Sequence, residues 1–163
     1  MPGAGPAMNL PELLVTIAIA GILASLSLVN GGEPLARQRL EAASRELWLG
    51  LEKARDQASR QGQACALELA SDGWRAPNGG SLAACNQALG PLLEGGGADQ
   101  LRVSHNLAGA LSFTPNGLVL SGGTVRLAME GTSLERCLVI SLPLGITRLG
   151  RYQQGSCGAD ETL

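Results

Sequence analysis

The stretch Met8–Val29 reads MNLPELLVTIAIAGILASLSLV, and the rest of the chain is organised around it. From Leu13 to Val29 it contains no charged residue, and its polar side chains are the hydroxyls of Thr16, Ser25 and Ser27, which can bond to helix carbonyls. A helix rises about 1.5 Å per residue, so this stretch spans about 33 Å, enough for a hydrocarbon core of about 30 Å. We therefore predict a single membrane-spanning helix over residues 8–30.

One acid, Glu12, stands at the start of the apolar run. An acid at membrane depth costs about 2.5–3.5 kcal/mol on insertion scales, and such residues usually have a partner. We therefore expect Glu12 to meet a positive charge. The alternative is a cleaved secretory signal, but its apolar core is usually only about 7–15 residues long.

The sequence PELLVTIAIAGILASLSL resembles the N-terminal segment of type IV pilins and type II secretion pseudopilins. The resemblance implies that a prepilin peptidase removes a leader, residues 1–7, by cutting between Ala7 and Met8. Met8 then becomes the methylated N-terminus, and Glu12 pairs with the α-amino group of a neighbouring subunit during filament assembly. The family usually has Gly before the cut and Phe after it, and basic residues in the leader. Either processing is unusual here or the true start codon lies upstream.

The length of chain that follows this helix, residues 31–163, is enough for one modest domain with its own core. A net charge of −2 gives no global attraction to nucleic acid. Aromatic residues make up only 2% of the chain, so the core must be built from Leu, Val, Ile and Ala. The resemblance places this domain in the periplasm and the helix in the inner membrane.

A second helix is predicted over residues 35–60, after the helix-breaking sequence NGGEP at 30–34. Its apolar residues recur at spacings of three and four, which is typical of a helix with one buried face: Leu40, Ala43, Leu47, Leu51, Ala54 and Ala58. The charged residues between them predict a solvated face, with Glu41 and Arg45 four residues apart and able to pair along the helix. We expect the apolar stripe to lie against a sheet.

Beyond residue 61 the sequence predicts short strands separated by turns. The expected strands are 64–70, 74–76, 101–103, 110–113, 118–121, 124–129, 137–142 and 146–152, with an irregular loop at 77–97 and a loose tail at 155–163. A long helix followed by antiparallel strands predicts an α+β fold in which the sheet packs on the helix.

The stretches ARDQASRQGQACALEL, LSFTPNGLVL and CLVISLPLGITRLGR resemble the minor H-type (GspH/FimT-like) branch of the pseudopilins. The expected fold is therefore pilin-like.

Four cysteines follow the first helix: Cys65, Cys85, Cys137 and Cys157. In an oxidising, periplasm-like compartment an even set predicts two disulfides, with three possible connectivities. We favour Cys65–Cys85 and Cys137–Cys157 because each pair is local in sequence, although the spacing leaves the other connectivities open. The cysteines form no CxxC pair and the single histidine, His105, is distant, so no zinc site is predicted.

No catalytic constellation is present in the sequence, and we predict neither an enzyme nor a cofactor. The expected function is that of a structural subunit of a type IV pilus or a type II secretion pseudopilus. It would prime the filament or lie at its tip, and its partners would be other pilins or pseudopilins. One alternative is a tip subunit that binds DNA, because Arg148-Leu149-Gly150-Arg151 partly resembles the glycine-arginine motif of FimT-like pilins. Contacts from Arg148 and Arg151 alone would be weak and sensitive to salt. The other alternative is a single-pass periplasmic domain that never assembles.

Overall fold

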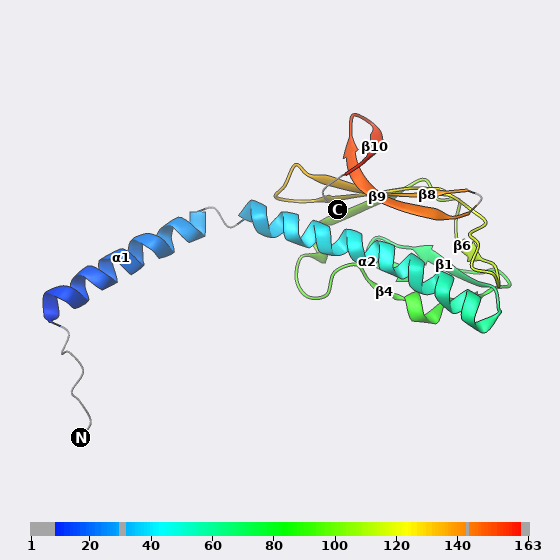
Figure 1. Ribbon diagram of the computed structural model, residues 1–163, viewed down its shortest axis with the longest axis horizontal. Coiled ribbons are helices and arrows are strands. Elements are labelled where there is room, and N and C mark those ends of the chain that lie inside the picture. The colour runs from blue at the N-terminus through cyan, green and yellow to red at the C-terminus, as the bar shows by residue number, and fades with distance from the viewer. Residues whose placement is uncertain (1–8, 30–31, 143, 161–163) are drawn as a thin grey trace, which may run out of the picture. The chain divides into compact units, whose positions relative to one another are not determined.

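The computed structural model of the 163-residue chain describes residues 9–29, 32–142 and 144–160. The chain divides between Leu35 and Ala36 into two compact units. The first contains α1 (Leu10–Val29), and the second contains every strand (Figure 1). A second helix, α2 (Gly32–Gln61), begins in the last residues of the first unit and continues through the second.

In α1 the hydroxyls of Thr16 and Ser25 bond to helix carbonyls, as the sequence predicts. Thr16 Oγ1 donates to the Leu13 carbonyl and Ser25 Oγ donates to the Ile22 carbonyl, each at 2.8 Å. Within the described residues, no helix combines the length and the hydropathy needed to cross a membrane. The predicted span 8–30 begins and ends at residues that lie outside the described part of the chain.

The second helix begins three residues before the predicted range 35–60. Pro34 lies in its first turn, where a missing N–H costs no helical hydrogen bond. Gly62 has a φ of 61°, a left-handed conformation that favours glycine and ends the helix. One face is buried, and it carries the predicted stripe together with further small or polar residues: Ala36, Leu40, Ala43, Ser44, Leu47, Gly50, Leu51, Ala54, Gln57 and Ala58.

The strands form two sheets. In the first, β1 (Cys65–Leu69) pairs antiparallel with β2 (Gly73–Arg75) and β6 (Leu111–Phe113), and parallel with β3 (Ala83–Ala84). The short β4 (Gly90–Pro91) pairs with β2. Short 3-10 turns at Asn86–Ala88 and Ala98–Gln100 complete this part of the chain.

The second sheet is antiparallel throughout, in the order β10-β9-β8-β7-β5. Its strands are β5 (Leu101–His105), β7 (Gly123–Met129), β8 (Glu135–Ser141), β9 (Ile146–Gln153) and β10 (Ser156–Ala159). Figure 1 shows α2 running along both sheets. The predicted α+β fold, a long helix packed on strands, is confirmed, with two sheets in place of one.

Two local predictions were wrong. Segment 118–121 forms no strand and contributes only the bridge between Phe113 and Val119. The tail expected to be loose at 155–163 contains β10, because Ser156–Ala159 pairs with Gly150–Gln153 and Cys157 is bonded to Cys137.

Both disulfides join the pairs that are local in sequence. Cys65–Cys85 has a Cα–Cα distance of 5.2 Å and Cys137–Cys157 one of 5.9 Å. The first attaches the 77–97 loop to β1, and Gln57 Oε1 on α2 accepts from the Gln87 N–H at 2.9 Å in the same loop. The loop is thus held at two points despite its low content of regular structure.

A glycine in the middle of α2 allows the first sheet to approach the helix. A Cβ added at Gly50 would lie 2.2 Å from Trp74 Cδ1, so the indole occupies the space of the missing side chain. Trp74 is 3% exposed, and its Nε1 donates to the Leu47 carbonyl at 3.0 Å. The helix-weakening glycine is therefore explained by close packing.

We expect Gly50→Ala to lower the free energy of unfolding. Alanine favours a helix by about 1 kcal/mol over glycine, but displacing a buried indole costs typically 1–3 kcal/mol, and the indole would also lose its hydrogen bond. Gly32→Ala is the control, because no heavy atom lies within 4 Å of its Cβ position. Urea unfolding of residues 32–163 followed by circular dichroism measures both, and a Gly50→Ala protein as stable as the control would contradict the packing argument.

Candidate functional site

Glu12 lies in the first turn of α1, and its side chain is exposed. Its backbone N–H donates to the Asn9 carbonyl at 2.9 Å. The predicted processing residues, Ala7 and Met8, lie outside the described residues. The large apolar side chains of α1 that the structure describes are about half exposed or more on all sides of the helix: Leu10, Leu13, Leu14, Val15, Ile17, Ile19, Ile22 and Leu23. A helix that is apolar all round requires apolar surroundings.

A buried arginine joins α2 to the second sheet and to the end of the described chain. Arg136 on β8 is 5% exposed. Its Nε donates to Glu41 Oε1 at 2.7 Å, its Nη2 also donates to Glu41, and its Nη1 donates to Asp160. Burial alone would lower the pKa of Arg136, but the hydrogen bonds to Glu41 and Asp160 outweigh it and the pKa is raised. Glu41 is therefore a tertiary contact, in place of the predicted pair with Arg45.

The structure does not bring Arg148 and Arg151 together. They are three residues apart on β9, so they point to opposite faces of the sheet. Arg151 lies opposite Arg136, and its Nε is 3.7 Å from Asp160 Oδ2. Arg148 lies opposite Val139 on the other face and is exposed. This arrangement does not favour a joint contact of the two arginines with a nucleic acid backbone.

The outer face of the second sheet carries a further arginine. Arg126 Nη2 donates to Glu135 Oε1 at 2.5 Å, and this hydrogen bond raises the pKa of Arg126. Its guanidinium also lies over the Tyr152 ring, 4.6 Å from the centroid. His105, at the end of β5, is exposed, and the described residues hold no cluster of three metal-ligating side chains.

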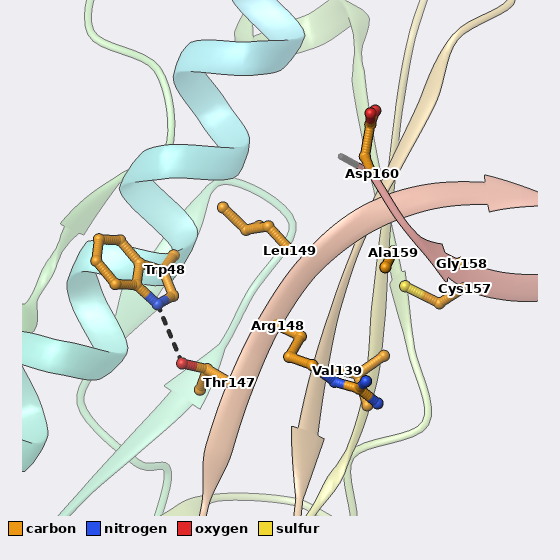
Figure 2. A pocket seen from close by; sticks show the side chains of 9 residues that line it. All are labelled: Trp48, Val139, Thr147, Arg148, Leu149, Cys157, Gly158, Ala159 and Asp160. Atoms are coloured by element: carbon orange, nitrogen blue, oxygen red, sulfur yellow. Dashed lines mark hydrogen bonds between the residues drawn. The ribbon is translucent and has the colours of Figure 1, made fainter. Parts of the chain in front are cut away.

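A groove of about 490 Å³ lies beside β9, between α2 and the end of β10 (Figure 2). Trp48 on α2 and Leu149 line its helix side, and Trp48 Nε1 donates to Thr147 Oγ1 at 3.0 Å. Thr147 Oγ1 in turn donates to Glu52 Oε1 at 3.2 Å. These two bonds fix the start of β9 against the helix.

Next to this groove, two loops and the first residue of β9 present exposed aliphatic side chains: Leu118, Leu120, Leu142 and Leu144 on the loops, and Ile146 on the strand. Arg55 on α2 holds both loops, because its Nε donates to the Gly117 carbonyl at 3.1 Å and its Nη2 to the Leu144 carbonyl at 3.1 Å. One guanidinium therefore fixes the backbone of both loops that carry these aliphatic side chains.

The family model described as type II transport protein GspH matches residues 43–144, which include most of α2, all of β1–β8 and both aliphatic loops. The chain belongs to the GspH family. The crystal structure of the type IV minor pilin FimU from Pseudomonas aeruginosa (strain PAO1) is similar to the structure of this GspH-family chain, with a TM-score of 0.52 and 25% sequence identity. The similarity covers 74% of this chain and 97% of that chain. No curated protein sequence gives a significant match.

These findings confirm that the sequence resembles the minor H-type branch of the pilins and pseudopilins. The family and the fold of this chain are those of structural pilin-type proteins. The Arg136 cluster in this GspH-family domain was not predicted from the sequence. Its only local signal was an arginine next to a cysteine on a predicted strand, and its partners are far away in sequence.

We expect Arg136→Ala to destabilise the domain by roughly 3 kcal/mol, because it leaves the carboxylates of Glu41 and Asp160 together without their shared cation. Arg102→Ala is the control. Arg102 forms an exposed pair with Glu130, at 2.7 Å, and such pairs contribute about 0–1 kcal/mol. Chemical unfolding of both variants measures the difference, and equal losses would show that the buried cluster contributes no more than a surface pair.

Proposed function

We propose that this chain is a minor pilin or pseudopilin, a structural subunit of a type IV pilus or of a type II secretion pseudopilus. The observation that carries the proposal is α1, an apolar helix with one acid in its first turn, joined to a domain of the GspH family. A structural subunit needs no catalytic group, and its activity is the set of contacts that it makes with its neighbours.

The apolar side chains of α1 suit two environments that the helix would enter one after the other. After synthesis the helix would lie in the inner membrane, with residues 31–163 in the periplasm, where disulfides such as Cys65–Cys85 persist. The helix would then move into a filament core built from the same helices of other pilins. Both environments cover the apolar surface that α1 exposes.

Glu12 would supply the specific contact in that core. An unpaired carboxylate in apolar surroundings is costly, and a cationic N-terminus of a neighbouring subunit would offset this cost. Processing by a prepilin peptidase between Ala7 and Met8 would create such an N-terminus. Assembly and processing are thus linked through one ion pair.

The test is intact-mass analysis of the chain co-expressed with a prepilin peptidase. We expect a product that begins at Met8 and carries one added methyl group. The control is co-expression with a catalytically inactive peptidase, which should leave the leader in place. A chain that stays uncut with the active enzyme would overturn the proposed pathway and favour the anchored domain that never assembles.

We also expect Glu12→Ala to abolish incorporation into filaments while leaving membrane insertion intact, because the N-terminal amine of the neighbour loses its partner. Glu46→Ala, an exposed acid on α2, is the matched control and should be incorporated normally. Immunoblotting of sheared filaments and of the membrane fraction measures both quantities. Normal incorporation of Glu12→Ala would remove the assembly role from this residue.

A further inference from the structure

The two disulfides of the domain differ in exposure, although they enclose loops of the same size. In each, the two cysteines are 20 residues apart, so the loop-closure contribution to stability is the same for both. Cys65 and Cys85 are 4% and 0% exposed and belong to the hydrophobic core. Cys137 is 1% exposed, but its partner Cys157 is half-buried. Of the two disulfides, Cys137–Cys157 is therefore the one that a reductant in solution can reach.

Cys157 borders two hollows in the surface. It lines the groove beside β9, where Figure 2 shows its sulfur, and a second hollow of about 390 Å³ that Tyr152 and Ser156 also line. Thiol–disulfide exchange is fastest where the attacked sulfur is accessible, and a disulfide inside a core reacts only after the surrounding structure opens. Exposure therefore favours reduction of this bond before the one between Cys65 and Cys85.

The exposed disulfide crosses a strand. Cys137 lies opposite Gly150 of β9, and the strand that carries Cys157 pairs with the other side of β9, so the bond joins β8 to β10 over the strand between them. A Cβ added at Gly150 would lie 3.3 Å from Cys157 Sγ and 2.1 Å from the Gly158 carbonyl oxygen. The glycine thus leaves the path that the disulfide and β10 take across β9.

Few other contacts hold β10 in place. Three of its four residues are exposed: Ser156, Gly158 and Ala159. Among the strands that the structure describes, β9 is its one pairing partner. A two-stranded hairpin with little buried apolar surface is only marginally stable in water. The position of β10 therefore depends on contacts other than its own packing.

A further contact is the ion pair between Asp160 and Arg136. The Asp160 side chain is 10% exposed, accepts from Arg136 Nη1 and lies 3.7 Å from Arg151 Nε. Arg136 also donates to Glu41 through Nε and Nη2, so it keeps a carboxylate partner when Asp160 leaves. Water can then bond to the freed Nη1. Release of Asp160 does not leave the arginine without a counter-charge, and the covalent bond is the stronger restraint on β10.

We propose that Cys137–Cys157 is a redox-sensitive latch on β10. A dithiol protein opens this disulfide while Cys65–Cys85 stays closed. β10 then separates from β9, takes Asp160 away from Arg136 and uncovers the edge of β9 along Gly150–Gln153. Re-oxidation returns the strand to its place. The latch is a property of the domain and does not depend on the proposed role in a filament.

The chemical step is a two-electron thiol–disulfide exchange. A thiolate of the reductant attacks Cys157 Sγ, the bond between the two sulfurs breaks, and Cys137 leaves as a thiolate that takes up a proton. The second thiol of the reductant then attacks the reductant's own sulfur in the mixed disulfide, and Cys157 is released and protonated. The reductant gives up two electrons and two protons and becomes a disulfide, and the two cysteines of this chain become thiols.

The test is reduction of the full chain, folded in detergent micelles, with dithiothreitol. Free thiols are trapped with iodoacetamide at intervals and located by peptide mass spectrometry. We expect Cys137 and Cys157 to be alkylated at least about tenfold faster than Cys65 and Cys85, because the buried pair must wait for local opening. Equal rates, or the opposite order, would overturn the proposal.

Hydrogen exchange of the selectively reduced protein then shows where β10 lies. We expect amide protection to fall along β10 and along Gly150–Gln153, to stay in β1 and β6, and to return on treatment with oxidised glutathione. Protection that persists in β10 would show that the disulfide is not what holds the strand. Protection lost throughout the domain would show that the bond supports the whole fold. Either result would overturn the latch.

Two variants separate the disulfide from the ion pair. Cys137→Ala/Cys157→Ala should show the open state with or without dithiothreitol, and a protected β10 in this variant would contradict the proposal. In the oxidised Asp160→Asn chain, β10 should stay protected, because the disulfide still joins it to β8. Loss of protection there would assign the position of the strand to the ion pair and overturn the latch.

Discussion

The second unit depends on one face of α2 that is built mainly from small residues. Ala43, Ala54 and Ala58 are fully buried there, and Gly50 admits the Trp74 indole, so the strands approach the helix closely. Both sheets contribute to the same core against this face, with Leu67 and Leu111 from one and Val125, Leu127 and Leu138 from the other. A change that moved the helix would therefore open both sheets at once.

Polar contacts along the flank of α2 then determine where the second sheet lies. Glu41 accepts hydrogen bonds from Arg136 of β8. Trp48 and Glu52 both bond to Thr147 of β9, and Arg55 bonds to the loops at the end of the domain. These contacts occur at intervals along the helix, so they fix both the position and the direction of the strands. Several charges that look like a solvated helix face are thus internal contacts of the domain.

The sequence predicts the helices, the α+β class and most strands, because apolar periodicity and turn residues are local signals. It does not predict the Arg136 cluster, since Glu41 and Asp160 lie far from Arg136 in the chain and only the fold brings them together. Strand β10 was missed for a similar reason. Its four small residues, SCGA, have little strand preference of their own, and its conformation comes from pairing with β9 and from the bond to Cys137.

The contact between Trp48 and Thr147 has a spectroscopic consequence. The chain has only two tryptophans, and their surroundings differ: Trp74 is 3% exposed in the core, whereas Trp48 is 36% exposed at the rim of the groove. Their emission in the native state should separate into a shielded component and one that a soluble quencher reaches. The intrinsic fluorescence of this protein thus reports on the core and on the groove beside β9 independently, without an added label.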